Sequence, residues 1–314
     1  MFGYAVKRLL QSLFTLFIVV SLVFLLMRLL PVEGYFGDRF QKMSVGEVQA
    51  SLRKMGLLDP WYLQLGRFYA GVARGDLGVS FIYRRDVPIT KIIAPRIPYS
   101  AGFGLVAIAI AMTAGLAMGV GMARNKGKLQ DRAGTVYIVF VNAVPLAVYL
   151  LFVQLYGSSL LHLPILFDKY NIASWILPAV SMSLNGIAFY AMWIRRYMVD
   201  ELNKDYIKLA RAKGLPNRTV MVRHVMRNAY VPMAQYLPAA ILATIGGSIY
   251  IESLYSIPGM GGLLVDVIQR QDNAMVQALV LIFSSVGIVG LFLGDLLMAL
   301  LDPRIKLAKG GGAR

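Results

Sequence analysis

The sequence contains no cysteine, only two histidines, and half as many acidic as basic residues. The lack of cysteine excludes disulfide bonds and thiolate chemistry. Two isolated histidines, His162 and His224, cannot form a His-rich metal site. We therefore expect no metal on this chain, and its scattered Asp and Glu residues show no pair that would suit acid–base catalysis.

A nucleotide-binding loop is also missing. Such a loop needs a glycine, four residues, and then Gly-Lys-Ser/Thr, so that backbone N–H groups can surround phosphate. The nearest match, at Gly127-Lys128, has Met122 in place of the first glycine and Leu129 in place of the hydroxyl residue. Metalloprotease and serine-hydrolase motifs are absent as well. We expect this chain to be no enzyme and to hold no cofactor, so that any ATP is hydrolysed by a partner.

Apolar residues are abundant instead. They make up 58% of the chain, against roughly 45–50% in soluble domains, which predicts a protein that crosses the membrane several times. The net charge of +16 comes from Lys and Arg that flank the apolar runs, as is typical of the side of the membrane that faces the cytoplasm. No aromatic–basic recognition module interrupts these runs, so we do not expect a nucleic-acid partner.

The apolar runs predict an all-α polytopic membrane protein with six transmembrane helices. The predicted spans are residues 9–30, 99–123, 133–156, 175–195, 230–251 and 277–301. The third span contains Pro145, and residues 252–276 are expected to form an outer loop. The clusters of Lys and Arg place both termini in the cytoplasm.

The domain boundaries follow from these spans. Residues 1–30 are the N-terminal tail and first helix, 31–98 a small extracytoplasmic subdomain, 99–302 a five-helix core that includes a cytoplasmic loop at 195–229, and 303–314 a cytoplasmic tail. In the subdomain, Ser44 and Glu47 have capping-box spacing, Pro60 starts another helix, and residues 79–83 are expected to be extended.

Polar residues inside the predicted spans are few. Asp295 is the only acid well within a span, and pairing with a nearby cation is favoured over a proton relay. Asn142 and Asn185 could line a pathway or hydrogen-bond a neighbouring helix, of which the second is commoner. Small residues recur every four positions in the second span and predict a helix-packing stripe; they are Ala107, Ala111, Gly115 and Gly119.

The cytoplasmic loop contains a run of good helix formers from Asp205 to Lys213, which Gly214 and Pro216 should end. Leu209, Ala210 and Gly214 bracket a face of small residues where another backbone could approach, and Lys and Arg surround it. This surface suits docking into a groove on a partner protein.

Four clusters of motifs resemble a known family. They are DYIKLARAKGL at 205–215 followed by HVMRNAYVP at 224–232; MGLLDP at 55–60 with Gln64 and GDLGVS at 75–80; ESLYSIPGMGGLL at 252–264; and DPR at 302–304. The chain resembles the inner-membrane permeases of ATP-binding-cassette (ABC) importers, in the oligopeptide/dipeptide/nickel branch, whose coupling segment is the EAA loop. It departs from the broader EAA pattern at Lys208 and Leu209, and from the branch at residues 31–34.

The resemblance implies a permease subunit in the bacterial inner membrane that moves peptides handed over by an extracytoplasmic binding protein. The implied partners are a second homologous permease, two cytoplasmic ATPases that bind ATP and Mg, and membrane lipid. The implied ATPase-coupling residues are Tyr206, Leu209, Ala210, Ala212, Gly214 and Leu215, and candidates for the translocation path are Asn142, Asn185 and Glu252. The motifs do not separate peptides from nickel complexes or oligosaccharides. An ion-coupled secondary transporter working through Asp295 is the alternative from another class, although no internal repeat supports it.

Overall fold

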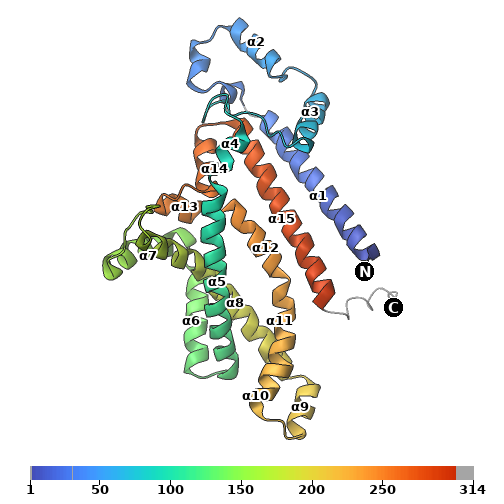
Figure 1. The fold of residues 1–314 in the computed structure, drawn as a ribbon, viewed down its shortest axis with the longest axis vertical. Coiled ribbons are helices and arrows are strands. Elements are labelled where there is room, and N and C mark those ends of the chain that lie inside the picture. The colour runs from blue at the N-terminus through green and yellow to red at the C-terminus, as the bar shows by residue number, and fades with distance from the viewer. Residues whose placement is uncertain (1, 30, 302–314) are drawn as a thin grey trace.

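The computed structural model describes residues 2–29 and 31–301, and nearly all of these form helices (Figure 1). The DPR motif and the tail that follows it lie outside the described residues. Four helices are long and apolar enough to cross a membrane as single rods: α1 (Phe2–Arg28), α5 (Ile97–Arg124), α8 (Ala173–Leu202) and α15 (Asn273–Leu301). These confirm the first, second, fourth and sixth predicted spans, with helix ends that extend beyond most of the predicted limits.

The third predicted span is not one helix. It is divided into α6 (Leu129–Ala143) and α7 (Leu146–Leu161), which are bent by 112° where Val144 precedes Pro145. Val144 is extended because the proline ring disfavours helical geometry in the residue before it. Pro145 therefore ends the helix, where the sequence interpretation had placed it inside a span.

The fifth predicted span is interrupted as well. It consists of α11 (Arg227–Ala234), α12 (Tyr236–Ala243), η4 (Thr244–Gly246) and α13 (Ile249–Tyr255). The part from Tyr236 to Gly246 and α13 differ in direction by 41°. The break falls at Gly247, whose φ of 68° few other residues adopt. The chain thus has up to six spans if each bent pair is one span.

The segment at 252–276, expected as an outer loop, is mostly helical, and its place outside the membrane stays a prediction. Residues 252–255 complete α13, and α14 (Met260–Gln269) follows after a short turn. The inner face of α14 is apolar, with Met260, Leu263 and Val267 fully buried. It packs against α15 and the short helix α4 (Ile89–Ile93), so this segment closes one end of the bundle.

The predicted packing stripe is confirmed on α5. Its four small residues are buried and face α8. A Cβ added at Gly115 would lie 2.8 Å from the Ile187 carbonyl oxygen, and one added at Gly119 would lie 2.6 Å from that of Ala191. The two helix backbones can approach this closely because these side chains are missing.

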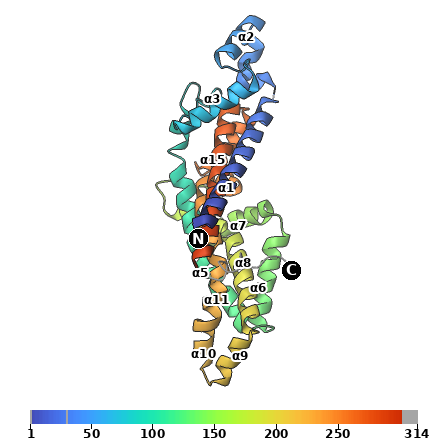
Figure 2. The same cartoon turned by 90° about the vertical axis from the view of Figure 1, so that its right-hand side faces the viewer.

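Residues 31–88 form a cap at the end of α1 that Figure 2 shows at the top of an elongated molecule. The cap contains η1 (Val32–Tyr35), η2 (Gly37–Lys42), α2 (Val45–Lys54) and α3 (Trp61–Ala73). The capping box is confirmed, since the Glu47 backbone N–H donates to Ser44 Oγ and the Ser44 N–H donates to Glu47 Oε2. These bonds to Ser44 lower the pKa of Glu47. The expected extended run at 79–83 is reduced to one isolated bridge between Val79 and Pro88.

A buried carboxylate joins the cap to the bundle. Asp272, just before α15, is fully buried and accepts hydrogen bonds from Ser80 Oγ at 2.6 Å and from the Ile82 and Tyr83 backbone N–H groups. Ser80 is the last residue of the GDLGVS motif, so at least this position of the motif has a structural role. The cap is therefore held on the bundle by a carboxylate that all these donors satisfy.

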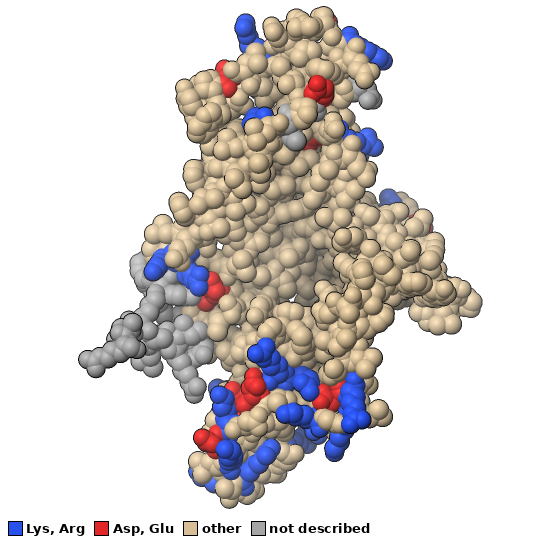
Figure 3. Space-filling view, turned by 180° about the vertical axis from the view of Figure 1, so that it is seen from behind, with Lys and Arg blue, Asp and Glu red and all other residues tan. Residues whose placement is uncertain are grey.

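Charged side chains gather at the two ends of the molecule. In Figure 3 the lower end is covered by Lys and Arg with interspersed acids, and the upper cap carries a few charges. The face between them is almost uncharged apart from small groups at its two edges. The apolar side chains on this middle region include many exposed ones, such as Phe14, Phe17 and Phe152. An exposed apolar belt between polar ends is what a bilayer requires.

Candidate functional site

The lower end in Figure 1 is a basic lobe formed by residues 195–229. It consists of the end of α8, α9 (Asp205–Ala212), α10 (Asn217–Thr219), the π-helix η3 (Val220–Met226) and the start of α11. Ile207, Val220 and Val225 are fully buried and continue the core that α8 forms with α5. The lobe is therefore a folded extension of the membrane bundle.

Helix α9 confirms the predicted helix and its end. The Leu215 N–H donates to the Ala210 carbonyl and the Gly214 N–H donates to that of Arg211, which is the Schellman arrangement. Gly214 has a φ of 77°, and a Cβ there would meet nothing within 4 Å. Glycine is thus required at this position for its backbone conformation and not for space.

Polar contacts fix α9 within the lobe. The Tyr206 hydroxyl donates to Glu201 at the end of α8, and it accepts a hydrogen bond of 2.7 Å from Asn228 Nδ2 on α11. Lys208 Nζ donates to Asp205 Oδ1 at 2.8 Å, and this bond lowers the pKa of Asp205. The helix is therefore tied to both membrane helices that enter the lobe.

The outer surface of α9 is partly apolar. Leu209 is 57% exposed, Tyr206 40% and Leu215 37%, and Ala212 and Gly214 are also exposed. Basic side chains surround this surface: Lys204, Lys208, Arg211 and Lys213. We call it the α9 face.

Ala210 lies elsewhere. It is 7% exposed and packs into the lobe core with Ile207 and Val225, so it does not belong to the small exposed face that the sequence interpretation described. Ile207 and Ala210 are three residues apart, so they lie on the same side of the helix and face inward. Leu209 therefore points outward. A role for Ala210 in coupling stays a prediction, and it would act through the position of α9.

Sequence reasoning missed two features of the lobe. The π-helix η3 connects α10 to α11, and no residue in it signals that geometry. Arg195 near the end of α8 forms a bidentate ion pair with Asp131 on α6, at 2.5 and 2.8 Å, and Asp131 is buried. This pair joins the lobe to the start of α6.

The three candidates for a translocation path lie on three different helices, α6, α8 and α13. Asn142 and Asn185 are exposed on this chain, and Asn142 Nδ2 donates to the Ile138 carbonyl on its own helix. Within the described part of this chain, Asn142 is thus bonded to its own helix, and a bond to a neighbouring helix stays a prediction. Whether Asn142 or Asn185 lines a path stays a prediction.

Glu252 is buried and holds three elements together. It accepts hydrogen bonds from Ser100 Oγ on α5 at 2.7 Å, from the Gly262 N–H on α14 at 3.0 Å and from the Ser248 N–H at 3.3 Å. Gly259 leaves room for this carboxylate, since a Cβ there would overlap it. The ESLYSIPGMGGLL motif thus builds a satisfied buried network, and a role for Glu252 in the path is untested.

Asp295 is paired, in agreement with the interpretation favoured from the sequence. Its Oδ2 lies 3.4 Å from Arg8 Nε on α1, and its Oδ1 accepts a hydrogen bond of 3.2 Å from Gln235. The contact joins α1 to α15 where both carry charge near one end of the apolar region.

Helices that form an exposed apolar belt, a cap at one end and a basic lobe at the other define a multi-span membrane protein. Residues 111–307 match the family described as the binding-protein-dependent transport system inner membrane component. The chain belongs to this family of transport-system permeases.

Curated relatives agree with this assignment. The dipeptide transport system permease protein DppB of Lactococcus lactis is 31% identical over 98% of this chain and 100% of its own length. The glutathione transport system permease protein GsiC of Salmonella paratyphi A is 32% identical over 98% of this chain and 99% of its own. The oligopeptide transport system permease protein AmiC of Streptococcus pneumoniae is 36% identical over 78% of this chain, which spans about half of AmiC (51%). A crystal structure of an amino acid ABC transporter with histidines shares the fold, with a TM-score of 0.52 at 18% identity over 68% of this chain and 94% of that one.

Proposed function

We propose that this chain is one of two permease subunits of an ATP-driven importer that moves peptides delivered by an extracytoplasmic binding protein. The observation that carries the proposal is the α9 face, where exposed Leu209 and Tyr206 are surrounded by basic side chains on a rigid lobe. An apolar centre with a charged rim is the usual form of a protein interface. The names of the relatives support peptides as the cargo.

The proposed occupants of the interfaces follow from their chemistry. Two cytoplasmic ATPases, which bind ATP and Mg, take the α9 face of this subunit and the equivalent face of a second permease. The second permease covers exposed apolar side chains in the membrane, among them Phe140 and Phe152. We do not propose an ion-coupled transporter. Such a transporter would rely on Asp295, and Asp295 is paired with Arg8.

Reconstitution tests this function. We expect proteoliposomes with both permeases, both ATPases and the binding protein to accumulate a labelled di- or oligopeptide when ATP is supplied, whereas the purified chain alone should neither bind nor hydrolyse ATP. Peptide uptake by this chain alone along an ion gradient, with no ATPase present, would refute the proposal.

We also propose that the lobe and both termini face the cytoplasm and that the cap lies outside. The density of Lys and Arg in the lobe supports this orientation, because short basic loops stay inside. As the chain has no cysteine, single cysteine replacements can report this orientation. Ser51→Cys on α2 should react with an impermeant thiol reagent in intact cells, and Asn217→Cys should react only after permeabilisation. The reverse pattern would invert the topology.

A further inference from the structure

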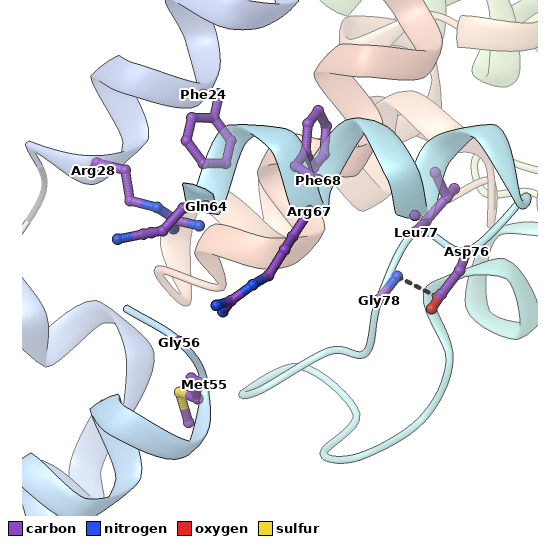
Figure 4. Close-up of a pocket in the computed structure, with 11 residues that line it drawn as sticks. Phe24, Arg28, Met55, Gly56, Gln64, Arg67, Phe68, Asp76, Leu77 and Gly78 are labelled. Atoms are coloured by element: carbon purple, nitrogen blue, oxygen red, sulfur yellow. Dashed lines mark hydrogen bonds between the residues drawn. The ribbon is translucent and has the colours of Figure 1, made fainter. Parts of the chain in front are cut away.

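A cavity of about 420 Å³ lies where the cap meets the end of α1 (Figure 4). Its walls come from α1, from the turn that follows α2, from α3 and from the turn that follows α3. Phe24, Phe68 and Leu77 form apolar wall, while Arg28, Gln64, Arg67 and Asp76 supply polar groups. Its volume is within the range of about 300–1,000 Å³ typical of small-molecule sites.

Two buried polar atoms at this cavity lack partners among the described residues: Arg28 Nε and Gln64 Oε1. Arg28 otherwise donates from Nη1 to the Tyr35 hydroxyl and lies over the Phe24 ring, and it forms no ion pair within the described part of the chain. Gln64 uses its amide nitrogen on the Leu57 and Asp59 carbonyls. Since unpaired buried polar atoms are costly, one donor and one acceptor here favour a bound molecule that pairs with both.

The charges in the cavity indicate which ligand would suit both atoms. Arg67 is neutralised by Asp59 at 2.6 Å, so Arg28 is the cation left to bind an anionic group. Asp76 accepts from the Gly78 N–H and, among the described residues, pairs with no cation. A phosphate would accept from Arg28, and a primary ammonium would donate to Gln64, which lies beside Arg28 in Figure 4. The complementary ligand is thus a zwitterion with phosphate and ammonium groups.

The surroundings of the cavity are those of a membrane interface. Arg28 ends the apolar helix α1, and Phe24 lies one turn, about 6 Å, further into the apolar region. Helix α3 rests on this end of α1, because the Tyr69 hydroxyl donates to the Phe17 carbonyl and Phe68 packs on Phe24. The start of α3 exposes Trp61, Tyr62 and Leu63. Exposed aromatic side chains at the charged end of an apolar helix are characteristic of the headgroup level.

We propose that this cavity binds the headgroup of a phosphatidylethanolamine molecule from the leaflet on the cap side, with its phosphate on Arg28 and its ammonium on Gln64. The apolar wall formed by Phe24 and Phe68 receives the adjoining glycerol and first acyl carbons. The bound lipid joins α1 to the cap and satisfies the two unpaired atoms.

The test compares lipids on the assembled permease complex in nanodiscs with equal amounts of dioleoyl phosphatidylethanolamine, phosphatidylcholine and phosphatidylglycerol. After mild detergent extraction, the lipids retained per complex are quantified by mass spectrometry. The retained amount of phosphatidylethanolamine should exceed that of the other two lipids by about tenfold. The trimethylammonium of phosphatidylcholine cannot donate a hydrogen bond, and phosphatidylglycerol has no ammonium, so both lose the hydrogen bonds of a charged donor. Equal retention of the three lipids would overturn the proposal without any mutation.

Two variants and a soluble competitor sharpen the test. Arg28→Gln should reduce phosphatidylethanolamine to the level of phosphatidylcholine, while Arg74→Gln, which removes the same charge at the end of α3 outside the cavity, should leave it unchanged. Unchanged retention in Arg28→Gln contradicts the site.

Glycerophosphoethanolamine or a dipeptide such as Ala-Ala should fail to displace the lipid at millimolar concentration. Displacement by either would mean that the cavity takes a free zwitterion and would overturn the lipid assignment.

Discussion

Leu209→Asp is expected to abolish peptide uptake while the permease still reaches the membrane at its normal level. Leu209 is more than half exposed on the free chain, so an aspartate there costs little in folding. Once an ATPase covers the α9 face, the same change removes a buried leucine worth about 1.5–3 kcal/mol and leaves a desolvated charge. By the tenfold-per-1.4 rule, ATPase association should fall at least about tenfold.

The measurements for this variant are membrane abundance, ATPase co-purification and uptake. Leu209→Met is the matched control, since it keeps an apolar side chain of similar volume and should retain both ATPase and uptake. Normal ATPase retention and uptake in Leu209→Asp would exclude the α9 face as the coupling surface.

Gly119→Val should cause the largest loss of folded protein. The new Cβ would lie 2.6 Å from the Ala191 carbonyl oxygen and 3.0 Å from the Ala191 Cα, so α5 and α8 must separate. Overpacking of this kind costs about 1–3 kcal/mol or more, so the melting temperature should fall by a few degrees.

Gly102→Val on the same helix is the control, because a Cβ there meets nothing within 4 Å. Thermal unfolding of both variants, purified in the same detergent, compares them directly. Equal melting temperatures would show that the close approach of α5 and α8 contributes little to stability.

Local signals were predictable from the sequence. The end of α9 at Gly214, the capping box at Ser44 and the packing stripe on α5 depend on residues a few positions apart, and all three agree with the structure. Pro145 was visible too, but an apolar run on both sides of a proline does not reveal whether the helix kinks or ends.

Long-range partners could not be predicted. Glu252 and Asp272 are satisfied by Ser100 and Ser80, which are 152 and 192 residues away in the chain. The side of α9 that faces inward depends on a core completed by Val220 and Val225, so Ala210 and Leu209 could not be told apart as buried and exposed. Sequence motifs located the α9 face, and only the tertiary structure identified Leu209 as its centre.

Because the sequence has no cysteine, a single introduced thiol can test directly whether the α9 face binds an ATPase. Leu209→Cys is expected to be the single thiol of this chain, and in the assembled complex a short thiol-linked photocrosslinker placed on it should join this chain to an ATPase subunit. Trp61→Cys in the cap, treated in the same way, should give no such product. Crosslinking to the ATPase from position 61 and not from position 209 would show that the α9 face does not bind the ATPase.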